Sequence, residues 1–146
     1  MSRDKLASQI LGMIPLFHRK LLKKYKSNEL KRTEFLLLNN LMMADGLPMN
    51  TYGEKLCISK PNLTKLVHEL VDKKWVKKEK SEEDKRVTRI YITDQGCLLL
   101  KENFKRMKEQ VIASTEKLTD DEVETLVVNF ESIHKIFLKL DDMYDE

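Results

Sequence analysis

The chain has 146 residues and a formal net charge of +3, which suffices for one domain with a hydrophobic core but not for two large domains. Its 41% hydrophobic and 35% charged residues, with only 4 Gly and 3 Pro, exclude long linkers and are typical of a soluble protein rich in surface helices. The apolar runs are too short to span a bilayer and the N-terminus lacks an uninterrupted apolar signal segment, so we expect a cytoplasmic protein without a membrane partner.

The N-terminal part of the chain predicts two helices. From Leu6 to about Tyr25, apolar residues recur every three or four positions and predict an amphipathic helix, which Pro15 is expected to bend. Thr33 is the predicted N-cap of a second helix. Because the stretch 35–43 is apolar almost all round, this second helix is expected to be buried in the middle of the domain.

A short third helix and an amphipathic fourth helix follow. Thr51 and Glu54 have the spacing of a capping box, which predicts a short helix that ends near Cys57. Ser59 is the predicted N-cap of the next helix, with Pro61 in its first turn, where a missing N–H costs little. The buried stripe of this fourth helix is expected to comprise Leu63, Leu66, Val67 and Leu70.

The C-terminal part predicts a hairpin and two helices. Residues 75–80 and 87–93 are rich in aromatic and β-branched residues, and the polar loop 81–86 between them predicts a β-hairpin. Thr93 is the expected N-cap of a long helix to about Ser114, and a capping box at 119–122 predicts the start of a final helix.

Charge is distributed unevenly. Residues 1–49 contain 9 Lys+Arg against 4 Asp+Glu, residues 50–93 contain 11 against 7, and residues 94–146 contain 7 against 13. The basic first two thirds favour an anionic partner such as nucleic acid, although a plain solubilising surface also explains them. On the fourth helix, the face opposite the apolar stripe carries polar side chains suited to a contact surface: Lys60, Asn62, Thr64, Lys65 and His68.

The order of these elements outlines a winged helix-turn-helix, with the hairpin as the wing. The wing shows an Asp-x-Arg pattern, an apolar-x-apolar pair and a Thr-x-x-Gly closure, formed by Asp84, Arg86, Ile90, Ile92, Thr93 and Gly96. With Ser59, the Leu63-Thr64-Lys65 run and Leu70 upstream, the chain resembles the MarR family of bacterial transcription factors over nearly its full length. Three places depart from the family pattern: Tyr52-Gly53 replaces Leu-Ala, Cys57 replaces a frequent Gly, and Lys74-Trp75 replaces Gly-Leu.

The resemblance implies a mainly α fold with a small β-hairpin, organised as one domain. Residues of about 30–93 would form the winged helix-turn-helix lobe, and residues of about 1–26 and 97–146 the dimerisation helices. A homodimer would then bind a palindromic operator as a ligand-responsive repressor, with the fourth helix in the major groove and Arg86, supported by Asp84, in the minor groove. The candidate DNA-binding residues are Ser59, Lys60, Asn62, Thr64, Lys65, His68, Asp84, Lys85, Arg86 and Arg89.

Other functions are less well supported by the sequence. A pocket for a small aromatic effector would be lined by Phe17, His18, Phe35, Leu38 and Met42. Each of these residues is also explained as ordinary core. The cysteines Cys57 and Cys97 and the three His show no metal-ligand spacing, so we expect no metal and no cofactor. The absence of a phosphate loop or nucleophile motif argues against an enzyme. A winged-helix protein-interaction module without specific DNA binding is the remaining alternative.

Overall fold

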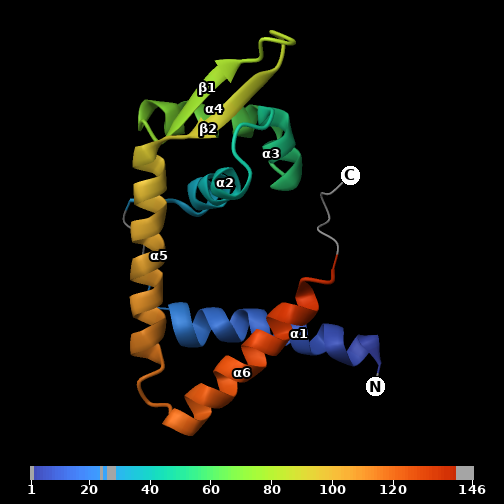
Figure 1. Cartoon of the computed structure of the whole chain (residues 1–146), viewed down its shortest axis with the longest axis vertical. Coiled ribbons are helices and arrows are strands. Elements are labelled where there is room, and N and C mark those ends of the chain that lie inside the picture. Colours follow the sequence, from blue (N-terminus) through green and yellow to red (C-terminus); the bar gives the residue numbers. More distant parts are fainter. Residues whose placement is uncertain (1, 24, 26–28, 141–146) are drawn as a thin grey trace. The chain divides into compact units, whose positions relative to one another are not determined.

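A computed structural model describes residues 2–23, 25 and 29–140 of the chain (Figure 1). The described part is mainly helical and contains one two-stranded antiparallel sheet, which confirms the expected fold class. The chain divides into two compact units: unit 1 consists of Met1–Lys24 and Glu109–Glu146, and unit 2 of Tyr25–Lys108. The outermost parts of the expected dimerisation segments, residues 1, 24, 26 and 141–146, lie outside the described residues.

Unit 1 contains helix α1 (Arg3–Phe17), the π-helix η1 (His18–Leu22), the end of α5 (Asp94–Ser114) and α6 (Asp120–Phe137). Helix α1 starts three residues before the predicted Leu6 because the Ser2 hydroxyl caps it, accepting the Lys5 N–H at 3.3 Å. The α-helix ends at Phe17 rather than near Tyr25. Pro15 has no N–H for the regular hydrogen bond, and three residues later the His18 N–H is shared by the carbonyls of Ile14 and Pro15, where the π-helix begins.

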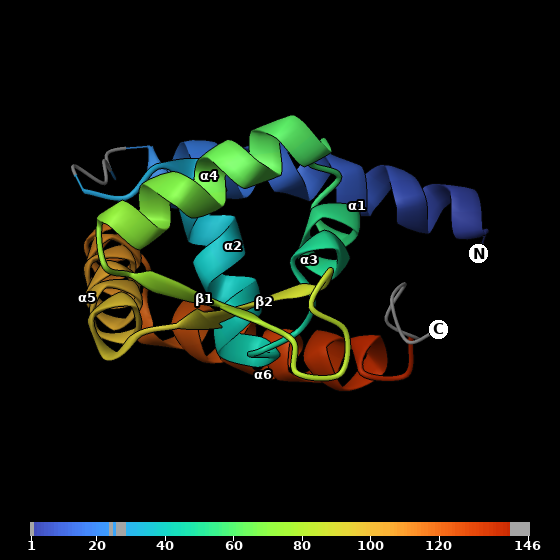
Figure 2. The same cartoon turned by 90° about the horizontal axis from the view of Figure 1, so that it is seen from above.

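Unit 2 contains α2 (Arg32–Met43), α3 (Met49–Lys55), α4 (Lys60–Asp72), β1 (Val76–Lys80), β2 (Thr88–Ile92) and the first part of α5. Figure 2 shows α2, α3, α4 and the hairpin gathered in this unit. Its core is formed by side chains that are at most 1% exposed: Leu37, Leu38, Leu41, Tyr52, Leu63, Leu70, Ile90 and Leu100. The burial expected for α2 is confirmed for one face only, because Leu36, Met42 and Met43 are 37%, 38% and 80% exposed. The apolar stripe of α4 is confirmed.

Two predicted helix starts are wrong. Helix α2 begins before Thr33, with Lys31 in the N-cap position, because the Glu34 carboxylate accepts the Lys31 N–H at 3.1 Å and closes the first turn. Helix α3 begins after Pro48, whose φ of −54° already fits a helical start, so Thr51 lies inside the first turn and donates its N–H to the Pro48 carbonyl at 2.9 Å. The proposed capping box of Thr51 and Glu54 is therefore not the start of this helix.

The other predicted caps are confirmed. Ser59 is the N-cap residue of α4, although its hydroxyl accepts no cap hydrogen bond from the helix. The Thr93 hydroxyl accepts the Gly96 N–H at 3.1 Å at the start of α5 and donates to the Lys74 carbonyl at 2.6 Å. At the start of α6, Thr119 and Glu122 form the reciprocal capping box, with distances of 2.9 and 3.3 Å.

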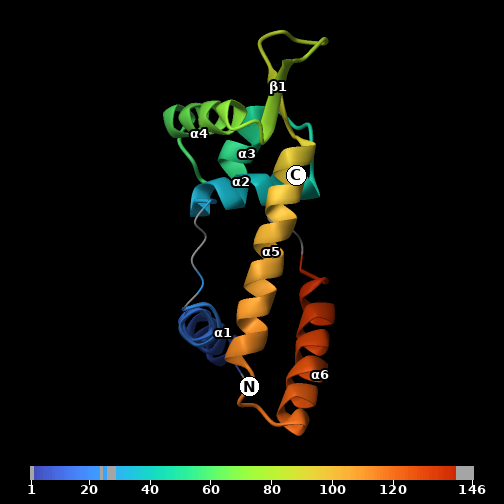
Figure 3. The same cartoon turned by 90° about the vertical axis from the view of Figure 1, so that its left-hand side faces the viewer.

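The hairpin is anchored at its base by the loop between α2 and α3. Val76 pairs with Ile92 and Lys80 with Thr88 in the antiparallel register. The Gly46 N–H donates to the Ile90 carbonyl at 3.0 Å, and the Ile92 N–H donates to the Asp45 carboxylate at 2.9 Å. The other end of the hairpin, around residues 82–86, projects away from α2, α3 and α4 (Figures 1 and 3). The wing is thus fixed at one end and solvent-facing at the other.

One buried ion pair connects α2 to the end of α4. The Glu34 side chain is fully buried, and its carboxylate accepts a hydrogen bond from Lys73 Nζ at 2.6 Å. Lys73 Nζ also lies 4.9 Å from the centre of the Trp75 ring, so its charge is stabilised by both a carboxylate and an aromatic face. This pair fixes the C-terminal end of α4 to the core of unit 2.

Two departures from the family pattern fall at left-handed backbone positions. Cys57 has a φ of 53° and Lys74 a φ of 64°, and both stand where the MarR pattern has Gly. A non-glycine residue in this conformation is sterically disfavoured. The turns before α4 and before β1 are therefore retained here at a local conformational cost.

No helix among the residues that the structure describes is both long enough and apolar enough to span a membrane.

Candidate nucleic-acid interface

Helix α4 has one packed face and one solvent-facing polar face. Leu63, Leu66, Val67 and Leu70 are buried, whereas the predicted contact residues Lys60, Asn62, Thr64, Lys65 and His68 are all exposed. Thr64 and His68 already have local partners: the Thr64 hydroxyl donates to the Lys60 carbonyl at 2.9 Å, and His68 Nε2 lies 3.4 Å from the Asp72 carboxylate. Lys60, Asn62 and Lys65 present amine and amide donors to solvent from the N-terminal half of the helix.

The turn between α3 and α4 is set by close packing. A Cβ atom on Gly53 would lie 2.8 Å from Leu63 Cδ2, so a larger residue there would require the Leu63 side chain to shift. The neighbouring Tyr52 is fully buried, and its hydroxyl accepts the Leu47 N–H at 3.1 Å and donates to the Ala44 carbonyl. At the Tyr52-Gly53 departure, a large buried ring is therefore followed directly by a residue without a side chain. Ser59 lies exposed at the N-terminus of α4, where N–H groups of the first turn favour an anion.

At the wing tip, Asp84 holds Arg86 by three hydrogen bonds. The Arg86 backbone N–H and Nε donate to Asp84 Oδ1 at 3.0 and 3.1 Å, and Nη2 donates to Oδ2 at 3.3 Å. The Arg86 side chain nevertheless remains 91% exposed. These hydrogen bonds, from the Arg86 side chain first and its backbone second, lower the pKa of Asp84 and keep the carboxylate ionised. The geometry restricts the guanidinium while leaving it accessible, with the exposed Lys85 beside it.

Arg89 differs from the other wing cations. Its side chain is directed towards the base of the hairpin, where Nη1 donates to the Gly46 carbonyl at 3.0 Å, and the residue is half-buried. Gly46 itself has a φ of 75°, and a Cβ atom there would lie 2.7 Å from the Tyr91 ring. In the structure Arg89 therefore anchors the wing to the loop between α2 and α3 and is not grouped with Arg86.

Sequence reasoning passed over two lysines beside α4. Lys78 and Lys80 line a hollow of about 260 Å³ between the N-terminal half of α4 and the hairpin, together with Met49, Thr64, Val67, Glu79 and Thr88. The two-residue alternation of a strand, counted from the buried Val76, puts both lysines on the face of the ribbon that packs against α4. This periodicity was available in the sequence and would have identified them.

The predicted effector residues belong to two different units. In unit 1, the Phe17 ring lies 5.8 Å from the Phe130 ring, and His18 is exposed on η1. In unit 2, Phe35 packs against Phe104 at 5.4 Å, Leu38 is fully buried in the core, and Met42 is 38% exposed. Phe17, Phe35 and Leu38 thus each have a packing role within their own unit.

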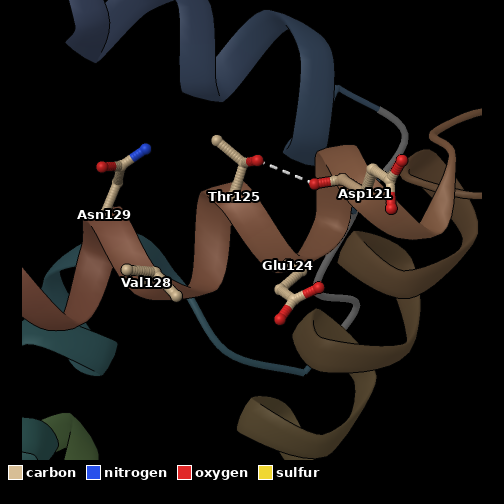
Figure 4. Close-up of a pocket in the computed structure, with 5 residues that line it drawn as sticks. All are labelled: Asp121, Glu124, Thr125, Val128 and Asn129. Atoms are coloured by element: carbon tan, nitrogen blue, oxygen red, sulfur yellow. Dashed lines mark hydrogen bonds between the residues drawn. The ribbon is translucent and has the colours of Figure 1, made fainter.

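Unit 1 contains an apolar groove between α1 and α6. Its volume is about 420 Å³, and it is lined by Leu6, Gln9, Ile10, Met13, Ile14, Phe17, Leu126, Asn129, Phe130, Ile133 and Phe137. A second hollow, of about 430 Å³, is lined by Asp121, Glu124, Thr125, Val128 and Asn129, which all lie on α6 (Figure 4). There the Thr125 hydroxyl donates to the Asp121 carbonyl at 2.8 Å. This second hollow is the side of a single helix, whereas the groove is formed by two helices.

Among residues 2–23, 25 and 29–140, no group of three or more His, Cys, Asp or Glu side chains is placed to hold a metal ion. Cys57 is exposed in the turn before α4, and Cys97 is half-buried near the start of α5.

Residues 17–107 match the family model described as "Transcriptional regulator SarA/Rot". The chain belongs to the SarA/Rot family of transcriptional regulators. The matched segment includes α2, α3, α4 and the whole hairpin, so the family assignment rests on the same elements that carry the polar face and the wing. This is a family of regulators rather than of enzymes.

Known proteins support the same fold along the chain. The chain is 27% identical to the "Uncharacterized HTH-type transcriptional regulator YpoP" of Bacillus subtilis (strain 168) over 138 residues, which cover 90% of this chain and 98% of the relative. The crystal structure of YusO from Bacillus subtilis matches with a TM-score of 0.70 at 19% identity, covering 92% of this chain and 99% of that one. A mutant MarR from E. coli, complexed with operator DNA, matches with a TM-score of 0.59 at 23% identity, covering 86% and 91%. The chain is thus a regulator with the MarR-type winged-helix fold.

Proposed function

We propose that this regulator is a sequence-specific repressor that binds duplex DNA through unit 2. One observation carries the proposal: unit 2 combines a helix with an exposed row of amine and amide donors and a wing that ends in a restrained, exposed Arg86. Lys and Asn side chains on a helix suit the donor and acceptor pattern of the major groove. A guanidinium on a thin ribbon suits the narrow minor groove, where the negative potential is focused. The similar MarR structure was solved with operator DNA, which supports the same use of the fold.

The proposed repressor acts as a homodimer formed through unit 1. Along α1 and α6, large apolar side chains are exposed in the single chain, including Ile10, Ile14, Phe130 and Ile133, at 39%, 61%, 44% and 44%. Contiguous apolar surface of this kind marks a protein–protein interface. One wing and one α4 contact only a few base pairs, so a two-fold dimer on two half-sites about 10 bp apart would supply the specificity of a palindromic operator.

We include ligand control in the proposal. The candidate residues divide between unit 1, with Phe17 and His18, and unit 2, with Phe35, Leu38 and Met42, so a small aromatic effector is tested against each unit separately. The test measures, by the fluorescence anisotropy of labelled operator DNA, whether small aromatic acids and phenols release the protein from the operator. Exposed residues His18 and Met42 are the informative positions, because substitutions there leave the buried core intact. If no ligand of this class shifts the anisotropy, ligand control through these residues is removed from the proposal.

The deciding experiment is selection of binding sites from a random pool of duplex DNA, with the full-length protein at near-physiological salt. A palindromic motif with half-sites about 10 bp apart is expected, at an affinity well above that for unrelated DNA. If only weak, sequence-independent binding is recovered, the DNA-binding proposal fails. In that case a winged-helix protein-interaction module becomes the better description.

A further inference from the structure

The hollow between α4 and the hairpin contains two lysines without a carboxylate partner. Among the residues that the structure describes, neither Lys78 nor Lys80 forms an ion pair, whereas their neighbour Lys77 lies 3.5 Å from Glu79 and 5.3 Å from the Tyr91 ring. Glu79 is the single acidic residue of the lining, and its carboxylate forms an ion pair with Lys77. The hollow therefore combines a net positive charge with the hydroxyl of Thr88, whereas the Thr64 hydroxyl in the same lining donates to the Lys60 carbonyl.

The position of the hollow limits what can occupy it. Lys78 and Lys80 follow the buried Val76 on the same face of β1, and this face packs against α4. The lining also includes the buried Val67 of α4 and the half-buried Met49 of α3, whereas Lys78 and Lys80 are exposed. The result is a positively charged hollow flanked by α4 on one side and the wing on the other.

We propose that this hollow binds the sugar–phosphate strand that separates the major groove from the adjacent minor groove, with Lys78 and Lys80 as phosphate contacts. The inference rests on the proposed function. If α4 occupies a major groove while Arg86 enters the neighbouring minor groove, one backbone strand must run between the two elements, and this hollow lies between them. Phosphates bound here would set the register of α4 on the duplex without reading sequence.

Other occupants fit less well. A small apolar effector would leave both ammonium groups without a counter-charge, and a metal ion would be repelled by them. An acidic protein partner would match the charge of the hollow. It would not explain why the hollow lies between α4 and the wing, which carry the other proposed DNA contacts. The duplex backbone accounts for both the charge and the position of the hollow.

The test compares Lys78→Gln/Lys80→Gln with Lys101→Gln/Lys105→Gln in the full-length protein. The control removes the same number of charges from exposed positions on α5 that lie outside the lining of the hollow. Affinity for the selected operator and for unrelated duplex DNA is measured between 50 and 300 mM salt. The Lys78→Gln/Lys80→Gln variant is expected to reduce the magnitude of the negative slope of log K against log salt by about 1.8, since each lost phosphate contact contributes about 0.9. The selected motif should not change, and the control should shift the slope by less than about 0.5.

A second arm addresses the phosphates directly. Neutral methylphosphonates are placed in the operator at the strand between the two grooves. They should weaken binding by the wild-type protein and have no further effect on the Lys78→Gln/Lys80→Gln variant. Equal slopes for the Lys78→Gln/Lys80→Gln variant and the Lys101→Gln/Lys105→Gln control, or an altered motif for the former, would overturn the inference while leaving the proposed function intact. If no motif is selected at all, the proposed function fails, and the slopes on unrelated duplex still decide whether the hollow binds phosphate.

Discussion

Arg86 is positioned by its neighbour Asp84 rather than by the body of the hairpin. The carboxylate receives hydrogen bonds from both the backbone and the guanidinium of Arg86, in an exposed loop that has no core of its own. This arrangement lowers the rotational freedom that the guanidinium would lose on entering a groove, and so reduces the entropic cost of binding. Asp84 is thus a positioning residue, and Arg86 is the proposed contact.

Replacing Arg86 by Ala should weaken operator binding by about 1–3 kcal/mol and reduce the magnitude of the salt slope by about one unit. The side chain is 91% exposed, so the free energy of unfolding should stay within about 0.5 kcal/mol of wild type. Titrations by fluorescence anisotropy and urea denaturation by circular dichroism measure the two quantities. Asp84→Asn should show a smaller affinity loss, because the guanidinium is retained but less restrained. Unchanged affinity in a folded Arg86→Ala protein would exclude the wing tip from binding.

Lys74 offers a stability test at the residue scale. Its φ of 64° is costly for a side chain with a Cβ atom, by about 1–2 kcal/mol, and glycine removes this cost while adding some entropy to the unfolded chain. Lys74→Gly should therefore raise the free energy of unfolding by about 0.5–1 kcal/mol in urea denaturation. Lys74→Ala is the matched control, because it removes the charge but keeps the Cβ atom, and it should bring no gain. A destabilised glycine variant would show that the turn tolerates the positive φ without strain.

Among the elements, the loop between α2 and α3 depends on Tyr52. Its buried hydroxyl bonds to the backbone of Ala44 and Leu47, and this loop in turn receives β2. Burial, as the main cause, raises the pKa of Tyr52 above its ordinary value of 10.0. The folded state therefore keeps the phenol protonated at a pH where Tyr52 of the unfolded chain ionises.

A raised folded-state pKa means that this contribution to stability is complete below about pH 10 and is lost as pH rises through the folded pKa. Tyr52→Phe should cost about 1–3 kcal/mol at pH 7, because the Leu47 N–H and the Ala44 carbonyl lose their partner. The difference in unfolding free energy between the two proteins should then shrink above pH 10. Urea titrations at pH 7, 9 and 10.5 measure it, and a difference that stays constant with pH would contradict the role assigned to the buried hydroxyl.

The elements themselves were largely predictable, since they follow from hydrophobic periodicity and from short capping motifs. Local signals predicted three kinds of feature correctly: the apolar stripe of α4, the hairpin, and the caps at Thr93 and Thr119. The starts of α2 and α3 were misplaced because Glu34 and Pro48 act on the turn before the expected cap. Arg89 was predicted only as a candidate DNA-binding residue, because its bond to Gly46 joins segments far apart in sequence and no local pattern reveals that anchoring role.

At the scale of the whole molecule, dimerisation is the property to test. Ile133→Glu places a charge in the apolar groove between α1 and α6, where it would lose its hydration in a dimer. We expect the variant to sediment as a monomer at micromolar concentration and to lose operator affinity, while circular dichroism shows an intact helix content. Val128→Glu is the control: it lies on the other hollow of α6, outside the groove, and is 55% exposed. Dissociation of both variants, or of neither, would argue against this groove as the interface.

The chain contains a single tryptophan, Trp75, between α4 and β1, with the Lys73 ammonium over its ring. Its intrinsic emission is therefore a built-in optical reporter for unit 2 alone. Unfolding of unit 1 should pass unseen in this signal, so comparing it with the far-ultraviolet signal separates the two units without any label. A nearby cation also alters indole emission, so loss of the Lys73–Trp75 contact when unit 2 unfolds would change the spectrum. The protein thus carries its own spectroscopic probe at the junction of its proposed recognition helix and its wing.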